Sequence, residues 1–290
     1  MIISIVTTTF NRANLLPRLF KSIKEQDYLD FEWLIIDDGS TDTTQTVVDS
    51  FILEDKVPLR YFKQENQGKH IGLNVAAEKA KGEVFFIVDS DDWLLPNALS
   101  IVVEHFTKIK GNTKLSGVSF PPQLTSKKNQ ARSGFESFIG NPISIRYHQK
   151  WRGDLVELFW TSVFRDFPFP EIKNERFCPE ALVWNRISST YDRLYVDQSF
   201  YCVEYQEDGL TDRIVKIRMK SPMASMLTYS ELNAYDIPRK EKIKSAINFW
   251  RFSFNSELGY RKKIKMIGPF NLWLFPLGFF LYVKDLLNIR

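Results

Sequence analysis

Three carboxylates end an apolar run in the segment VFFIVDSDDW, residues 84–93. Asp89, Asp91 and Asp92 lie close together in this segment, and ionised carboxylates at short range repel one another. An acidic turn in solvent would tolerate the repulsion. A divalent cation would relieve it, because Mg²⁺ and Mn²⁺ take oxygen ligands, usually one or two carboxylates plus substrate phosphates. Two acids one residue apart could divide the task, one binding a ribose hydroxyl and the other the metal ion.

A second acidic pair, Asp37 and Asp38, lies in IIDDGSTD, residues 35–42. A tight turn with a helix cap at Ser40 or Thr41 explains part of this pattern. A carboxylate directed into a cleft would also accept a hydrogen bond from the N–H of a base such as uracil. Together the two acidic segments favour a site for a nucleotide and a cation over a solvated turn.

The elements that must position these acids alternate along the first 90 residues. Buried strands and amphipathic helices are predicted in turn at 2–6, 14–23, 33–36, 41–52, 59–62, 68–81 and 84–88. This alternation is typical of an α/β domain with a mostly parallel sheet. Such sheets bind ligands at the carboxyl ends of their strands, where Thr7–Thr9 and both acidic segments fall. We therefore expect these residues to converge on one cleft.

The alternation weakens beyond about residue 110. Residues 121–150 are predicted to be a long irregular segment. A helix is predicted at 181–189, with short strands at 194–196 and 201–205 and a helical, basic region from about 221.

Four segments, in this order, resemble the glycosyltransferase family 2 enzymes of GT-A fold: TTTFNR, IIDDGSTD, ENQGKHIGLNVAAEKAKGE and VFFIVDSDD. The resemblance covers Ile2–Asp92. It implies an α/β fold with a Rossmann-like, mixed but mostly parallel sheet flanked by helices. It also implies an inverting hexosyltransferase of the bacterial polysaccharide type. Such an enzyme takes its sugar from a nucleotide diphosphate donor, most often a UDP-sugar, and uses Mn²⁺ or Mg²⁺ as cofactor.

The resemblance also implies which residues bind the donor: Thr7, Thr9, Arg12, Asp38, Lys69, Asp89, Ser90 and Asp91. The first three would line the nucleoside pocket. Asp38 would contact the base, Asp89 the ribose and Asp91 the metal ion, as in the D-x-D signature of the family. Lys69 would balance phosphate charge. The adjacent His70 would either lie near the donor or be an exposed residue at a helix start.

Farther along the chain the resemblance implies that Glu180, directly before a short helix, is the general base. Glu175 competes for this role, and Cys178 as a nucleophile is a distant alternative. The region implied to face the acceptor includes Asp92, Arg152, Gly153, Asp154 and Trp160. Residues 204–205 and 209–211 resemble a flexible loop that closes over the donor.

The charge of the chain is uneven. Residues 206–290 hold 15 Lys and Arg against 8 Asp and Glu, a net +7, whereas residues 1–205 hold 24 against 27, a net −3. The end of the chain combines basic residues at 261–265 with a nearly uncharged, aromatic stretch at 267–283. This combination predicts peripheral association with an anionic membrane surface. The alternative is that the aromatic side chains cover the catalytic core.

The expected organisation has three parts: a nucleotide-sugar-binding half at 1–110, an acceptor-binding half at 111–215 and a basic, aromatic helical extension at 216–290. The acceptor would be a saccharide or a lipid-linked saccharide. The two cysteines, Cys178 and Cys202, are expected to be reduced thiols, and the N-terminal segment reads as a strand rather than a signal peptide. The cysteines favour a cytoplasmic protein, and the resemblance to bacterial polysaccharide enzymes implies a position at the cytoplasmic face of the inner membrane.

Other functions are less compatible with the sequence. A nucleotidyltransferase should carry a glycine-rich phosphate loop after its first strand, and TTTFNRANLL has no glycine. A non-catalytic sugar-nucleotide-binding or scaffold protein would not need the acids at 38, 89, 91 and 180. An oxidoreductase would need G-x-G-x-x-G after a strand, and a nucleic-acid-binding protein would need one of its own signatures; neither is found.

Overall fold

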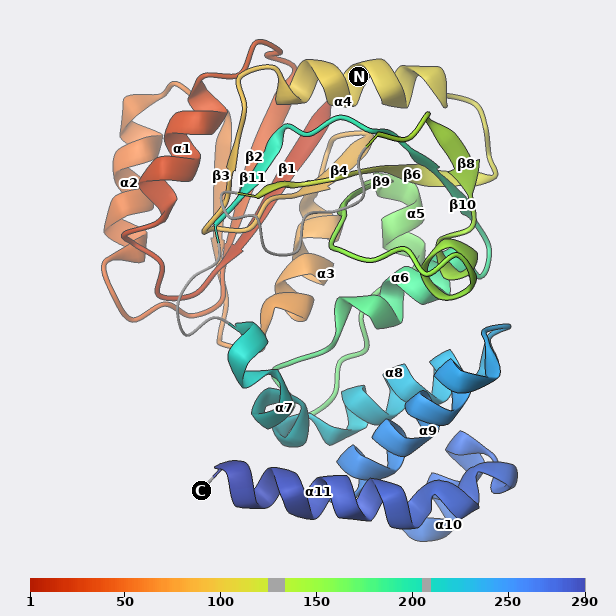
Figure 1. Ribbon diagram of the computed structural model, residues 1–290. Coiled ribbons are helices and arrows are strands. Elements are labelled where there is room, and N and C mark those ends of the chain that lie inside the picture. The colour runs from red at the N-terminus through yellow and green to blue at the C-terminus, as the bar shows by residue number, and fades with distance from the viewer. Residues whose placement is uncertain (125–133, 205–209, 290) are drawn as a thin grey trace.

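The computed structural model of the chain describes residues 1–124, 134–204 and 210–289. Among these residues, eight strands form one sheet in the order β3-β2-β1-β4-β9-β6-β10-β8 (Figure 1). The strands are β1 (Ile3–Thr9), β2 (Phe31–Asp37), β3 (Leu59–Lys63), β4 (Val84–Ile87), β6 (Leu115–Phe120), β8 (Phe138–Gly140), β9 (Val156–Trp160) and β10 (Asp192–Tyr195). A small second sheet has the order β5-β11-β7, from β5 (Trp93–Leu94), β11 (Tyr201–Val203) and β7 (Gln123–Leu124).

Most strands of the large sheet run in one direction. The strands β3, β2, β1 and β4 are parallel, and so are β6 and β10. The exceptions are β9, which is antiparallel to both β4 and β6, and β8, which is antiparallel to β10. Because β9 is reversed, its amino end lies at the edge where β4 and β6 end.

Helices cover both faces of the sheet, which explains why its central strands are apolar on both sides. One face packs on α1 (Leu16–Lys24), α2 (Thr44–Glu54) and α4 (Ala98–Lys108). The other packs on α3 (Lys69–Lys79), α5 (Thr161–Asp166) and α6 (Glu180–Ser188). Neighbouring residues of β4 show the alternation: Phe86 belongs to the first core and Phe85 to the second.

A helical layer follows the sheet domain. It comprises α7 (Leu210–Lys220), α8 (Pro222–Ala234), α9 (Arg239–Ser253), α10 (Tyr260–Ile267), the 3₁₀ helix η2 (Pro269–Leu274) and α11 (Phe275–Ile289). A core of its own, around Phe249 and Trp250, holds α8, α9 and η2 together. Figure 1 shows α8 next to α6 and α11 on the side of α9 that faces away from the sheet.

The predicted α/β architecture with a mostly parallel sheet is confirmed, and so is the order of strands and helices over residues 2–88. The ends of these elements differ. β1 continues to Thr9, so Thr7–Thr9 belong to the strand. The helix predicted from residue 41 begins at Thr44, with Thr43 rather than Ser40 or Thr41 at its N-cap.

The region predicted to be irregular contains regular elements: β7, β8 and the π-helix η1 (Ser144–His148). The strands β6 and β9 were not predicted. The large sheet crosses the predicted boundary at 110, and the boundary at 215 falls within α7.

Candidate active site

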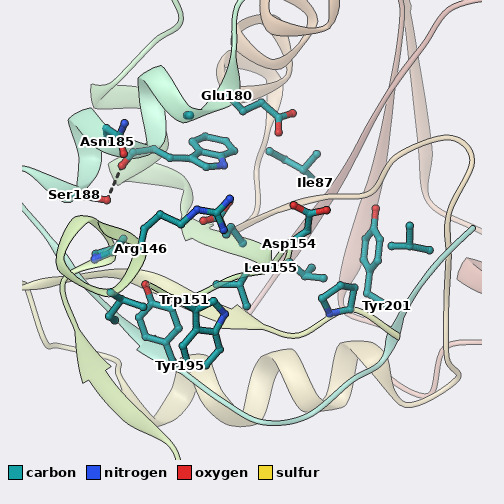
Figure 2. Close-up of a pocket in the computed structure, with 18 of the residues that line it drawn as sticks. Ile87, Arg146, Trp151, Asp154, Leu155, Glu180, Asn185, Ser188, Tyr195 and Tyr201 are labelled. Carbon is teal, nitrogen blue, oxygen red and sulfur yellow. Dashed lines mark hydrogen bonds between the residues drawn. The ribbon is translucent and has the colours of Figure 1, made fainter. Parts of the chain in front are cut away.

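A cavity of about 430 Å³ opens where the carboxyl ends of β4, β6 and β10 meet the start of α6 (Figure 2). Lys69, Asp89 and Glu180 line it toward α3, and β9 and η1 line its other end. Figure 2 shows Glu180, Arg146 and Asp154 directed into the same space. Residues at strand ends therefore converge on one cleft, as expected, and they come from both halves of the chain.

Lys69 joins the two sides of this cleft. Its Nζ lies 2.6 Å from a carboxylate oxygen of Asp89 and 2.8 Å from one of Glu180. Burial alone would lower the pKa of Lys69, but the two carboxylates hold that pKa above its ordinary value. Lys69 is therefore a fixed cation between the residue expected to bind the donor and the residue expected to act as base.

The backbone places Lys69 and Glu180 at the first positions of two helices, α3 and α6. Gly68 makes this approach possible. Its φ is +96°, and a Cβ there would come within 2.0 Å of the carbonyl oxygen of Arg176, just before α6. The negative charge of Glu180 also suits its place in the first turn of a helix.

Asp38 holds the segment that leads into α3. Its carboxylate accepts hydrogen bonds from the backbone N–H groups of Gln67 (2.9 Å) and Gly68 (2.7 Å) and from the side chain of Gln64 (2.8 Å). A carboxylate can accept about four hydrogen bonds, so one more acceptor position is left for a ligand. The structure thus gives Asp38 a positioning role that the sequence did not indicate.

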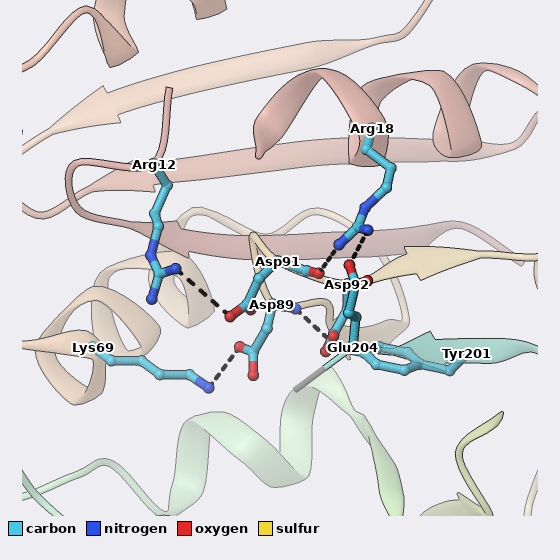
Figure 3. Close-up of polar contacts among 8 residues, drawn as sticks. All are labelled: Arg12, Arg18, Lys69, Asp89, Asp91, Asp92, Tyr201 and Glu204. Carbon is cyan, nitrogen blue, oxygen red and sulfur yellow. Dashed lines mark hydrogen bonds and ion pairs between the residues drawn. The ribbon is translucent and has the colours of Figure 1, made fainter. Parts of the chain in front are cut away.

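The acidic turn after β4 is balanced by arginines (Figure 3). The Asp91 carboxylate lies 3.8 Å from Arg12. Arg18 stacks over the Trp93 ring, donates to the backbone carbonyl of Asp91 and pairs with Glu204. These contacts hold the turn while leaving the Asp91 side chain about a quarter exposed, at 27%.

Asp92 differs from the other two carboxylates of the turn, Asp89 and Asp91, because it is buried. Its carboxylate accepts a 2.7 Å hydrogen bond from the Tyr201 hydroxyl, which itself accepts one from the backbone N–H of Asp89. Burial, together with repulsion from Asp89, raises the pKa of Asp92 to about 7. Asp92 lines the cavity, but its carboxylate is already used to hold β11 against the turn.

The residues around Asp91 fit a divalent cation that shares its ligands with a substrate. Asp89 and Asp91 present partly exposed, hard oxygen ligands, and two carboxylates plus phosphate oxygens satisfy Mg²⁺ or Mn²⁺. Within the described part of the chain, no cluster of three or more His, Cys, Asp and Glu could hold a metal ion by itself.

Three further residues expected at the donor site are buried. The Thr7 hydroxyl donates to the Val88 carbonyl and accepts from the Trp33 indole, so it is used within the sheet. Ser90 is buried in the acidic turn. The Thr9 hydroxyl is buried at the end of β1 and has no partner in the described part of the protein, so it could bind a ligand group.

Of the residues expected to face the acceptor, Asp154 lines the cavity and Trp160 does not. Trp160 ends the reversed strand β9 opposite Val84, at the start of β4, and its ring packs edge-on against Phe106. It therefore lies at the opposite edge of the sheet, and its expected position is corrected. The reversal brings Glu157 to the cavity instead.

Two of the alternatives for the catalytic group are used otherwise. The Glu175 carboxylate accepts hydrogen bonds from the backbone N–H groups of Met223 (2.7 Å) and Ala224 (2.8 Å), which caps α8. Burial raises the pKa of Cys178 to about 12, which disfavours a thiolate nucleophile. His70 is buried rather than exposed, and burial lowers its pKa to about 4.

The sequence did not indicate Arg18, Tyr201 or the pair formed by Glu157 and Arg193. Arg193 is fully buried and lies 2.9 Å from Glu157, with its guanidinium over the Phe159 ring. A charged residue inside an apolar strand pattern was the available signal, since such a residue needs a buried partner. The predicted loop residues 205 and 209 lie outside the described residues.

Comparison with known proteins agrees with this geometry. Residues 4–162, more than half of the chain, match the family description "Glycosyl transferase family 2". The chain belongs to this family, and the predicted family and enzyme class are confirmed.

Two curated relatives illustrate the similarity. The GalNAc(5)-diNAcBac-PP-undecaprenol beta-1,3-glucosyltransferase of Campylobacter jejuni is 30% identical over 69% of this chain and 61% of its own length. The poly(ribitol-phosphate) beta-N-acetylglucosaminyltransferase TarS of Staphylococcus aureus is 24% identical over 96% of this chain and 49% of its own length. The chain thus spans about half to three-fifths of the length of these relatives.

Solved structures show the same fold. S. aureus TarS 1-349 in complex with UDP superposes with a TM-score of 0.66 at 18% identity, covering 98% of this chain and 88% of that one. The mannosyltransferase PcManGT from Pyrobaculum calidifontis, in complex with GDP-Man and Mn²⁺, gives 0.57 at 17% identity, covering 95% and 72%. The predicted GT-A fold is confirmed.

Proposed function

We propose that the protein transfers a sugar, with inversion, from a nucleotide diphosphate donor to a hydroxyl group of a saccharide or lipid-linked saccharide. A UDP-sugar is the proposed donor, and Mn²⁺ or Mg²⁺ the proposed cofactor. The observation that carries the proposal is the double ion pair of Lys69. It holds Asp89, expected at the donor, and Glu180, expected at the acceptor, against the same ammonium group.

Glu180 suits the role of general base. Its side chain is 40% exposed and lines the cavity, so an acceptor hydroxyl can reach it. In the proposed step, Glu180 takes the proton of that hydroxyl while the oxygen forms a bond to the anomeric carbon. The bond from the anomeric carbon to the phosphate oxygen breaks on the opposite face, and the nucleoside diphosphate leaves. A single displacement of this kind inverts the configuration.

The donor side supplies positive charge and oriented acceptors. The diphosphate would lie between the acidic turn and α3, next to Lys69 and Arg12. Asp38 and the unpartnered Thr9 hydroxyl could bind the nucleoside. Asp91, with Asp89 beside it, would hold the cation. When bound, Mn²⁺ or Mg²⁺ would neutralise charge that develops on the leaving diphosphate.

Calorimetric titration of UDP, GDP and dTDP, each with Mn²⁺ and with a chelator, tests the donor side. We expect UDP to bind and to need the metal ion. A folded protein that binds none of the three would contradict the proposal and favour a scaffold role.

We further propose that the α10–η2–α11 face lies on the cytoplasmic leaflet of the inner membrane. Among the described residues, Pro269–Asn288 is the one helical segment long and apolar enough to span a membrane, and 17% of an apolar 18-residue stretch within it is buried. Its exposed side chains include Phe270 (92%), Trp273 (63%) and Phe280 (66%). Exposed Arg261, Lys262 and Lys265 lie beside it in α10.

The packing of α11 favours a helix that lies on the membrane rather than one that crosses it. Arg251 of α9 forms a two-pronged ion pair with Asp285 of α11, one contact being 2.6 Å. Gly278 packs so closely on α9 that a Cβ would come within 2.4 Å of the Trp250 side chain. A spanning helix would lose both contacts and would carry Asp285 into the hydrocarbon.

Vesicle sedimentation tests this orientation. The protein should bind vesicles that contain phosphatidylglycerol, and Trp273→Ser with Phe280→Ser should weaken binding about 10-fold or more by removing apolar area. Leu53→Ser is the matched control, because Leu53 is 85% exposed on α2, in the sheet domain. Equal losses for control and variant would contradict the proposed face.

A further inference from the structure

The end of the cavity beyond Glu180 differs from the donor side in its chemistry. Four aromatic side chains line it: Tyr147, Trp151, Trp184 and Tyr195. Figure 2 shows Trp151 and Tyr195 side by side at this end, with Arg146 and Asp154 between them and Glu180. Apolar walls with a few convergent polar groups are typical of sites for small molecules, and the apolar face of a pyranose ring packs well on aromatic rings.

The aromatic walls are rigid. Trp151 contacts the Phe135 ring edge-on with a centroid distance of 5.0 Å, and Tyr195 stacks on Phe138 at the same distance. Trp184 lies against Phe159 at 4.7 Å. Rings held in this way form a fixed slot, which favours a ring-shaped ligand over a flexible chain.

Carboxylates outnumber cations among the residues that line the cavity. The carboxylates are Asp89, Asp92, Asp154, Glu157 and Glu180, and the cations are Lys69 and Arg146. Lys69 is bound by two of these carboxylates. Arg146 donates a 2.8 Å hydrogen bond to the Gly153 carbonyl. Glu157 is itself paired with the buried Arg193 at 2.9 Å. If Arg193 is counted as a third cation and Asp92, with its raised pKa, is left out, the four carboxylates Asp89, Asp154, Glu157 and Glu180 still outnumber the three cations.

We propose that the acceptor unit that enters this cavity is an uncharged pyranose, and that the carboxylates reject acceptor units that carry a phosphate or a carboxylate. The inference rests on the proposed transfer reaction and specifies its acceptor. Asp154 and Glu157 would accept hydrogen bonds from sugar hydroxyls, which a neutral sugar donates freely. An anionic group at the same place would meet like charge in a partly desolvated site, so selection comes from repulsion as well as attraction.

Saturation-transfer NMR on the full chain with saturating UDP and Mn²⁺ tests the proposal. The neutral probes are the methyl β-glycosides of glucose, galactose, N-acetylglucosamine and N-acetylgalactosamine. Each hexoside is paired with its uronide and its 6-phosphate, which keep the ring and replace the neutral substituent at C6 by an anionic one. We expect at least one neutral glycoside to bind, and its charged partners to bind about 10-fold more weakly or not at all.

Two variants connect the result to this end of the cavity. Trp184→Ala should abolish binding of the neutral glycoside, whereas Asp154→Asn, at an exposed position, should strengthen binding of the uronide about 10-fold relative to the wild type. Equal or tighter binding of a uronide or phosphate by the wild type would overturn the proposal. If UDP binds but none of the neutral glycosides does, the proposed acceptor is overturned and the proposed transfer reaction is not. If UDP fails to bind, the proposed function itself is contradicted.

Discussion

Lys69 lies between two regions of the cleft that are constructed differently. On the donor side, Asp38, Asp89 and Asp91 come from the first 92 residues and are held by arginines, a lysine and backbone N–H groups. On the proposed acceptor side, Glu157 and Glu180 come from distant segments, and aromatic rings line the same cavity.

The difference agrees with what each region is proposed to bind. A nucleotide diphosphate and a cation are highly charged, so the donor side needs fixed charges of both signs close together. A sugar hydroxyl is neutral, so the acceptor side needs shape and one carboxylate that can take a proton. Variants on the acceptor side should therefore lower the transfer rate, and variants on the donor side should lower the affinity for UDP.

The largest effect is expected at the acceptor side. Glu180→Gln removes the proton acceptor, so the rate of UDP release from a UDP-sugar in the presence of an acceptor should fall about 10³-fold. UDP binding should change little. Glu175→Gln is the matched control, since it weakens the cap of α8 and should lower stability while leaving the rate near that of the wild type. Equal rates for Glu180→Gln and wild type would refute the assignment.

A smaller effect is expected at the donor side. Asp91→Asn removes the carboxylate proposed to hold the cation, so UDP affinity measured by calorimetry with Mn²⁺ should fall about 10²-fold. Affinity measured with a chelator should be unaffected. Glu104→Gln, an exposed position on α4, is the control. If the variant kept its Mn²⁺-dependent gain in affinity, the cation would have to lie elsewhere.

The contact between the two sides can also be broken through the backbone. Gly68→Ala combines strain at φ +96° with a collision against the Arg176 carbonyl, and should lower the free energy of unfolding by roughly 3 kcal/mol. Gly111→Ala separates the two causes, because Gly111 has φ +85° but nothing within 4 Å. Gly111→Ala should lower the free energy of unfolding, measured by chemical denaturation, by about 1 kcal/mol. Equal costs would show that the close approach of α3 to α6 adds nothing.

A further effect, on the pH dependence of stability, concerns Asp92, whose pKa is raised to about 7. Since the pKa is higher in the folded state than in the unfolded one, the protonated form stabilises the fold. In chelator, stability should therefore decrease as the pH rises from about 4 through about 7. Asp92→Asn should remove this decrease, as measured by guanidinium unfolding from about pH 4 to about pH 8. Parallel pH profiles for variant and wild type would contradict the buried position of Asp92.

The position of the proposed donor residues at one edge of the sheet could be predicted from the sequence, because they lie in short segments that follow four consecutive parallel strands. Asp89 and Asp91 follow their strand directly, so their place at the sheet edge depends only on local pattern. The uses of Thr7 and Asp38 inside the protein were not predictable in this way, since their partners Trp33 and Gly68 are about 30 residues away.

The acceptor side could not be predicted in the same way, because the direction of β9 is decided by long-range pairing with β4 and β6. The direction determines which end of a strand faces the cleft. The position of Trp160 in the chain predicts that it faces the cleft, but the reversed strand brings Glu157 there instead. Likewise, Glu175 and Glu180 are both candidate bases in the sequence, and only the position of α8 shows that Glu175 is used as a helix cap.

The most direct test of the central claim, that one cleft joins a metal-dependent donor site to a base at Glu180, is a crystal structure of the protein with UDP and Mn²⁺. The account predicts the ion on the Asp91 carboxylate, the diphosphate next to Lys69 and the aromatic end of the cavity left open for an acceptor. UDP bound away from this cleft, with Asp91 still paired to Arg12 and Lys69 still paired to Asp89 and Glu180, would contradict it.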